Sequence, residues 1–258
     1  MERIPDFQEK LSFNWTEHFI GDWDLFQKVL SNPETIFVYD VDGIIADTAE
    51  VVFKKFSQKN GIIANACDMD RWDYLSELAR KSGLSEDAIK HADDDWYKPE
   101  ILNEARRCLY VRPTILKTID FYGVDKNFAL TARNSDFRDS TIGWFVREIP
   151  EMKKENILIR DTEGIDLPGS AQFKVRTLRE LSKIAPWVVF VDDTVDFAQA
   201  VLTSGIENCL VVNVPQGKIM PGFTHERMVI IKRYPEEYQA MLPFMYAVFH
   251  AINVAQSY

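Results

Sequence analysis

Five short apolar runs, each three to five residues long, most constrain the fold of this chain. They are rich in β-branched and aromatic side chains, and polar or turn residues bound them, which is typical of strands. Strands without a polar face are buried between two layers, as in a parallel sheet. We therefore predict strands at residues 35–39, 128–130, 157–159, 187–191 and 210–214.

Helical patterns of apolar residues separate these runs. We predict helices at residues 114–122, 135–148, 175–185 and 197–205. A chain that alternates strands with helices favours a parallel sheet with helices packed on both of its faces. The predicted fold class is therefore α/β, with a doubly wound, Rossmann-like parallel sheet.

Residues 49–111 interrupt this alternation, because they show only helical signals. An insertion of this size after the first strand predicts a small helical lobe. Residues 1–34 precede the first strand and also look helical, which predicts an N-terminal helical extension. The remaining segments, 35–48 and 112–258, are expected to form the α/β core.

Aspartates directly follow two of the predicted strands. Asp40 and Asp42 follow the first strand, and Asp192, Asp193 and Asp196 follow the fourth. Open α/β sheets bind ligands at the carboxyl ends of their strands. Carboxylates gathered there repel one another, so a cation is expected between them. Oxygen ligands without Cys or His nearby favour a hard ion such as Mg²⁺ over Zn²⁺.

Net charge narrows the class of partner. The chain has 258 residues and a formal net charge of −10, which argues against nucleic acid because phosphate contacts need surplus Lys and Arg. We expect the partner to be a small phosphorylated metabolite, of the sugar phosphate or nucleotide type.

Cysteine content and the N-terminal sequence bear on the location. Cys67, Cys108 and Cys209 show no paired spacing, and no secretory signal pattern is visible, so a cytoplasmic location is expected.

The most apolar segment lies near the C-terminus. Met241–Ala255 is too short to cross a bilayer comfortably, so no membrane partner is expected. Met241, Phe244, Val248 and Ile252 fall on one helical stripe. This pattern predicts a helix that faces the core or a second copy of the chain, and it leaves a homo-oligomer open.

Four short motifs follow one another along the predicted core. Residues 40–48 read Asp-Val-Asp-Gly-Ile-Ile-Ala-Asp-Thr, and residues 130–133 read Leu-Thr-Ala-Arg. Lys174 comes next, at the start of a predicted helix, and residues 192–196 read Asp-Asp-Thr-Val-Asp. Together these segments resemble the four motifs of the haloacid dehalogenase (HAD) superfamily in its phosphatase form. The helical lobe lies where the helical cap of that family lies, and it is called the cap below.

The resemblance implies a hydrolase of phosphomonoesters that works through an aspartyl phosphate. Asp40 would attack phosphorus, and Asp42 would act as general acid and then as general base. Mg²⁺ would be held by Asp40, the backbone carbonyl of Asp42 and Asp192, with Asp193 or Asp196 in support.

The resemblance also implies a phosphate site. It places Thr131 and Ala132, at the end of the second predicted strand, against the phosphate, and Lys174 would balance charge on the aspartyl phosphate. Arg133 is a further candidate for a phosphate contact, and Arg176 is an alternative to Lys174 as the cation.

Other interpretations stay open at this point. A phosphomutase uses the same first two aspartates, and a non-catalytic binding module could use the same fold. Residues 192–196 also match the diphosphate–Mg²⁺ motif of terpene synthases, which would require an all-α fold. Trp72, Trp96 and Tyr97 either line a substrate cleft or form the cap's own core.

Overall fold

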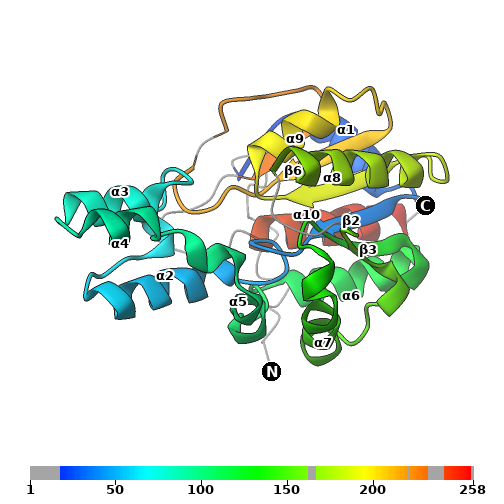
Figure 1. Cartoon of the computed structure of the whole chain (residues 1–258). Helices are drawn as coiled ribbons and strands as arrows, with labels where there is room; N and C mark the ends of the chain where they lie inside the picture. The colour runs from blue at the N-terminus through cyan, green and yellow to red at the C-terminus, as the bar shows by residue number, and fades with distance from the viewer. Residues whose placement is uncertain (1–17, 162–166, 220, 232–240, 257–258) are drawn as a thin grey trace, which may run out of the picture.

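The computed structural model describes residues 18–161, 167–219, 221–231 and 241–256 (Figure 1). Within them, seven strands form one sheet in the order β1-β7-β6-β5-β2-β3-β4, with every pair parallel except β1 and β7. The strands are β1 (Phe19–Ile20), β2 (Ile36–Asp40), β3 (Asn127–Thr131), β4 (Ile157–Ile159), β5 (Val188–Asp192), β6 (Cys209–Asn213) and β7 (Met228–Ile231). Five of these overlap the five predicted runs.

Two layers of helices cover the sheet, because successive strand residues point to opposite sides. Phe37 and Tyr39 enter one apolar core, while Ile36 and Val38 enter the other. The first core also takes side chains from α1 (Trp23–Leu30), α6 (Val111–Tyr122), α7 (Arg138–Glu148) and α10 (Met241–Ala255). The second takes side chains from α8 (Leu167–Ser182) and α9 (Val195–Leu202). The doubly wound α/β class is therefore confirmed, and the all-α fold of terpene synthases does not apply.

The cap lies to one side of the sheet and has its own apolar core (Figure 1). It consists of α2 (Thr48–Asn60), η3 (Ala66–Asp68), α3 (Tyr74–Lys81), α4 (Glu86–Lys90), η4 (Asp94–Tyr97) and α5 (Pro99–Glu104). Three further short 3₁₀ turns, η5 (Val124–Lys126), η6 (Ser135–Phe137) and η7 (Lys154–Asn156), belong to the α/β core. An inserted helical cap, as predicted, accompanies the sheet.

Several elements differ from their predicted bounds. The helix that was expected at 175–185 is α8, which begins at Leu167, so Lys174 lies inside it and does not open it. Helical signals were expected up to residue 111, but the last cap helix, α5, ends at Glu104, and Tyr110 adopts a left-handed conformation with φ of 66°. Residues 1–17 of the predicted N-terminal extension lie outside the described residues, and residues 18–34 contain α1 together with β1.

The C-terminal helix α10 packs inside this chain. Phe244, Val248 and Ile252 are fully buried in the first core, where α10 contacts α6 and α1. The predicted apolar stripe therefore faces the core, and a homo-oligomer stays a prediction. Within the described residues, no helix combines the length and the apolar character needed to span a membrane.

Two linkers join the cap to the core, and they lie side by side. Ala46 forms an isolated bridge with Arg107, and the Cys108 amide donates to the Ile45 carbonyl at 2.8 Å. Residues 216–219, which follow β6 and are called the cap-contact loop here, form a second contact between the α/β core and the cap. The Lys218 amide donates to the Met69 carbonyl at 2.6 Å, and Ile219 packs against the apolar core of the cap. The cap helix α5 also packs on α7, and its Leu102 lies in the first core. The cap is thus held at the linkers, at α5 and at this loop.

Candidate active site

Three buried carboxylates meet at the carboxyl ends of two neighbouring strands. Asp40 is the last residue of β2, Asp192 is the last residue of β5, and Asp193 follows it. One carboxylate oxygen of each lies within 4.8 Å of the others. Strand β2 lies between β3 and β5, and the strand order reverses its direction at this point of the sheet. Doubly wound sheets bind their ligands in the crevice at such a point, which is where the cluster lies.

Lys174 connects two of these carboxylates. Its Nζ lies 3.0 Å from an oxygen of Asp40 and 2.7 Å from an oxygen of Asp192, and the side chain is buried. The ring of Phe197 lies 4.1 Å from the same nitrogen, which adds a cation–π contact. Burial opposes the charge on Lys174, but Asp192 and Asp40 outweigh it and raise its pKa. Arg176, the alternative cation, is exposed on the outer side of α8 beside Phe173.

The cluster carries more negative charge than its lysine balances. Burial, followed by repulsion from Asp192, raises the pKa of Asp193 to about 7. Burial also raises the pKa of Asp40 well above its ordinary value, although Lys174 opposes the shift. Shifts of this cause and sign mark a place where a further cation would be stabilising. The donor atoms are all oxygen, so the residues fit a hard divalent ion such as Mg²⁺.

A tight turn after β2 depends on Gly43. This residue has φ of +77°, and a Cβ there would lie 2.2 Å from a carboxylate oxygen of Asp193 and 2.3 Å from Nε2 of Gln216. The same Nε2 donates to the Gly43 carbonyl at 2.7 Å. Glycine leaves room for the turn after β2 to approach Asp193 this closely.

Asp42 lies on this turn and is paired with Arg133. The Arg133 Nε lies 3.0 Å from one oxygen of Asp42, and its terminal nitrogen lies 2.7 Å from the other. Burial alone would raise the pKa of Asp42, but the charge and hydrogen bonds of Arg133 bring it below its ordinary value. Arg133 therefore contacts Asp42 here, and the ring of Phe137 packs 5.7 Å from its guanidinium.

Of the remaining predicted site residues, Thr131 and Ala132 lie at the end of β3, and Asp196 lies outside the carboxylate cluster. Thr131 ends β3 and is buried, and its hydroxyl accepts from the Arg133 amide at 3.1 Å. Ala132, next in the chain, lines the cavity beside Asp40. Asp196 is exposed in the first turn of α9 and is outside the group of three carboxylates.

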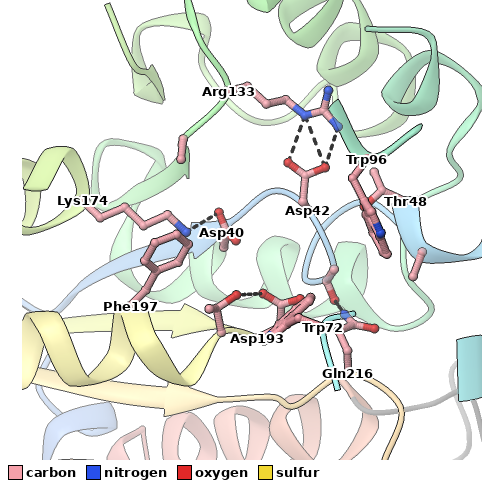
Figure 2. A pocket seen from close by; sticks show the side chains of 14 residues that line it. Asp40, Asp42, Thr48, Trp72, Trp96, Arg133, Lys174, Asp193, Phe197 and Gln216 are labelled. Atoms are coloured by element: carbon pink, nitrogen blue, oxygen red, sulfur yellow. Dashed lines mark hydrogen bonds and ion pairs between the residues drawn. The ribbon is translucent and has the colours of Figure 1, made fainter. Parts of the chain in front are cut away.

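A cavity of about 150 Å³ opens above the aspartates and brings core and cap together (Figure 2). Its lining includes Trp72 and Trp96 of the cap, and Trp96 also packs against Phe53 in the cap's own core, so both interpretations apply to it. Phe197 and Gln216, which the sequence did not indicate, line the cavity as well. Gln216 comes 173 positions after the glycine that it contacts, so no local pattern could have indicated it. The side chain of Tyr97 lies outside the described residues.

Comparison with known proteins gives structural matches only. No protein-family model matches the chain, and no curated protein matches it. A structure described as a haloacid dehalogenase-like hydrolase from Burkholderia xenovorans is 13% identical, with a TM-score of 0.47, over 82% of this chain and 95% of that chain. Protein tyrosine kinase A of Mycobacterium tuberculosis is 17% identical, with a TM-score of 0.48, over 81% and 98%. A HAD-superfamily hydrolase from Ehrlichia chaffeensis is 14% identical, with a TM-score of 0.44, over 83% and 97%.

Structures named as HAD-type hydrolases are thus among those that this chain resembles, as its motifs indicate.

Proposed function

We propose that the chain is a Mg²⁺-dependent phosphomonoester hydrolase of the HAD type, which acts on a small phosphorylated metabolite. One observation carries the proposal. Asp40, Asp192 and Asp193 are buried with oxygens within 4.8 Å of one another, and Lys174 bridges the first two. An anionic nucleophile can attack an anionic phosphate only where positive charge offsets the repulsion between them.

The metal would be held by the three clustered carboxylates. When bound, Mg²⁺ would stabilise negative charge on the phosphoryl group. Asp196, which is exposed and outside the cluster, has no place among the ligands in this proposal. The backbone carbonyl of Asp42 remains a proposed ligand on the strength of the motif alone.

Asp40 is the proposed nucleophile. One of its carboxylate oxygens forms a bond to phosphorus while the bond from phosphorus to the leaving oxygen breaks, and Asp42 gives a proton to that oxygen. Water then attacks the phosphorus of the aspartyl phosphate, and Asp42 takes the proton as the bond to Asp40 breaks. Lys174 holds Asp40 in place and balances its charge. Thr131 is the proposed hydroxyl donor to the phosphate.

Phosphate release from phosphomonoesters tests this proposal. We expect turnover with Mg²⁺ and none with EDTA, and loss of turnover in Asp40→Asn. Asp120→Asn, an exposed aspartate on α6, is the matched control and should retain wild-type activity. Turnover in Asp40→Asn equal to that of the wild type would exclude Asp40 as the nucleophile. Product analysis by ³¹P NMR distinguishes transfer to water from the transfer to a second hydroxyl that a phosphomutase performs.

A further inference from the structure

Two indoles of the cap line the cavity above the aspartates. Trp72 precedes α3 and Trp96 lies in η4, and both contribute to the cavity wall that faces Asp40 and Asp42. Figure 2 shows Trp96 beside Thr48, and Trp72 beside Asp193 and Gln216. Trp72 keeps 41% of its surface exposed, although large aromatic side chains usually bury most of theirs. Part of its surface, which lines the cavity, is therefore available to a ligand.

The cap contributes no charged group to the described lining of this cavity. Its lining residues are Thr48, Ala49, Trp72 and Trp96, all of them uncharged. The cations of the lining come from the core, and both already contact carboxylates. Lys174 contacts Asp40 and Asp192, and Arg133 contacts Asp42. A second anionic group on a substrate would consequently face indoles and carboxylates without a cation to pair with it, which is costly.

The size of the cavity sets a further limit. A cavity of about 150 Å³ in a protein core is large enough to hold one benzene ring. The cavity measured here has the same size and is open to solvent. It therefore has room for about one ring beside the indoles, and its open side leaves space for the rest of an ester.

We propose that the cap selects phosphomonoesters whose leaving group is one uncharged ring, aryl or pyranose, and that Trp72 and Trp96 bind the face of that ring. This inference rests on the proposed function and narrows its substrate class. Flat apolar faces pack well against indole rings, whereas an acyclic or anionic leaving group gains little from them.

Four esters test the selection in the wild-type protein with Mg²⁺. Phenyl phosphate and glucose 6-phosphate carry the ring, glycerol 2-phosphate is uncharged and acyclic, and 2-phosphoglycolate carries a second anion. We expect kcat/KM for at least one ring ester to exceed both others by roughly tenfold or more, as expected for one aromatic contact. A larger value for phenyl phosphate would assign the site to an aryl ring, and a larger value for glucose 6-phosphate to a pyranose.

Substitution of the indoles tests their part in that preference. Trp72→Ala and Trp96→Ala should each lower the ratio of kcat/KM between the ring ester and glycerol 2-phosphate by roughly tenfold, mainly through KM. Trp72→Phe should restore most of the ratio, because a flat face is retained. Ile63→Ala is the control, since Ile63 is an apolar cap residue that is 94% exposed and outside the cavity lining.

A binding measurement separates the inference from the reaction. Titration calorimetry of phenylphosphonate and methylphosphonate should give a tighter Kd for the phenyl compound in the wild type and a smaller difference between the two in Trp72→Ala, where only Trp96 remains. Hydrolysis of all four esters at equal kcat/KM, unaffected by the tryptophan substitutions, would overturn the ring selection and leave the phosphatase standing. Absence of Mg²⁺-dependent hydrolysis together with absence of phosphonate binding would overturn both.

Discussion

Arg133 holds both carboxylate oxygens of Asp42, at 3.0 Å through Nε and 2.7 Å through a terminal nitrogen. This ion pair connects the segment after β3, which contains Arg133, to the turn after β2, which contains Asp42. Its charge lowers the pKa of Asp42 against the effect of burial. Arg133 thus favours the carboxylate form of Asp42, which is the form needed to accept a proton from water in the second proposed step.

Arg133→Gln is therefore expected to shift the pH dependence of turnover. Without the guanidinium, burial would dominate and the pKa of Asp42 would rise. Since Asp42 must be deprotonated to accept a proton from water, the acidic limb of the kcat profile should move to higher pH. Arg138→Gln, which removes an exposed partner of Asp161, should leave the limb in place. An unmoved limb in Arg133→Gln would exclude control of Asp42 by Arg133.

Lys174→Met should destabilise the metal-free protein. Removal of one partner from a buried ion pair leaves charge without compensation and costs about 3–5 kcal/mol of unfolding free energy at neutral pH. Added Mg²⁺ should recover part of this loss. Urea denaturation measures both effects. Lys183→Met, at an exposed pair with Glu180, should change stability by less than about 1 kcal/mol. Equal stability of the two variants would contradict the role given to Lys174.

Affinity for Mg²⁺ should fall as the pH is lowered through about 7. Asp193 has a pKa of about 7 without metal, and a proton on its carboxylate competes with a cation. Calorimetric titrations in two buffers of different ionisation enthalpy should show proton release on binding near this pH. Asp193→Asn should weaken binding and reduce the release. Asp196→Asn should bind as the wild type does, and a large loss there would restore Asp196 to the ligand set.

Gly217→Ala is expected to disturb the cap-contact loop. A Cβ at this position would lie 2.4 Å from the Met69 carbonyl oxygen and 2.8 Å from that of Ala66, and φ is +52°. We expect a loss of about 1–3 kcal/mol in unfolding free energy, measured in urea. Gly222→Ala is the matched control, because its added Cβ would meet nothing within 4 Å. Unchanged stability in Gly217→Ala would mean that the loop adjusts without cost.

Much of the sheet could be predicted, because apolar runs that are buried on both faces leave a clear local pattern. The strand β7 was missed although residues 228–231 form such a run, and β1 is only two residues long. The ends of the helices could be predicted less well than the strands. Residues 105–110 continue a helical pattern beyond α5, but the chain leaves the helix at Ala105 to return to the linker bridge at Arg107.

The candidate site divides in the same way. Asp40 and Asp192 could be placed together, because parallel strands bring their carboxyl ends to one edge of a sheet. The pairing of Arg133 with Asp42 depends on side-chain directions that no spacing specifies. The positions of Trp72 and Trp96 depend on how the cap folds and sits over the sheet, which is a matter of contacts distant in sequence.

The backbone hydrogen bond from Lys218 to Met69 limits how the cavity can widen. A cap attached only at two adjacent linkers could rotate about them as a rigid body. In this protein α5 also packs on α7, and outward rotation of the cap would have to break the bond to Met69 and withdraw Ile219 from the apolar core of the cap. Any widening of the cavity by cap rotation therefore carries the free-energy cost of these contacts, and the residues after β6 contribute to that cost as well as those of the linkers.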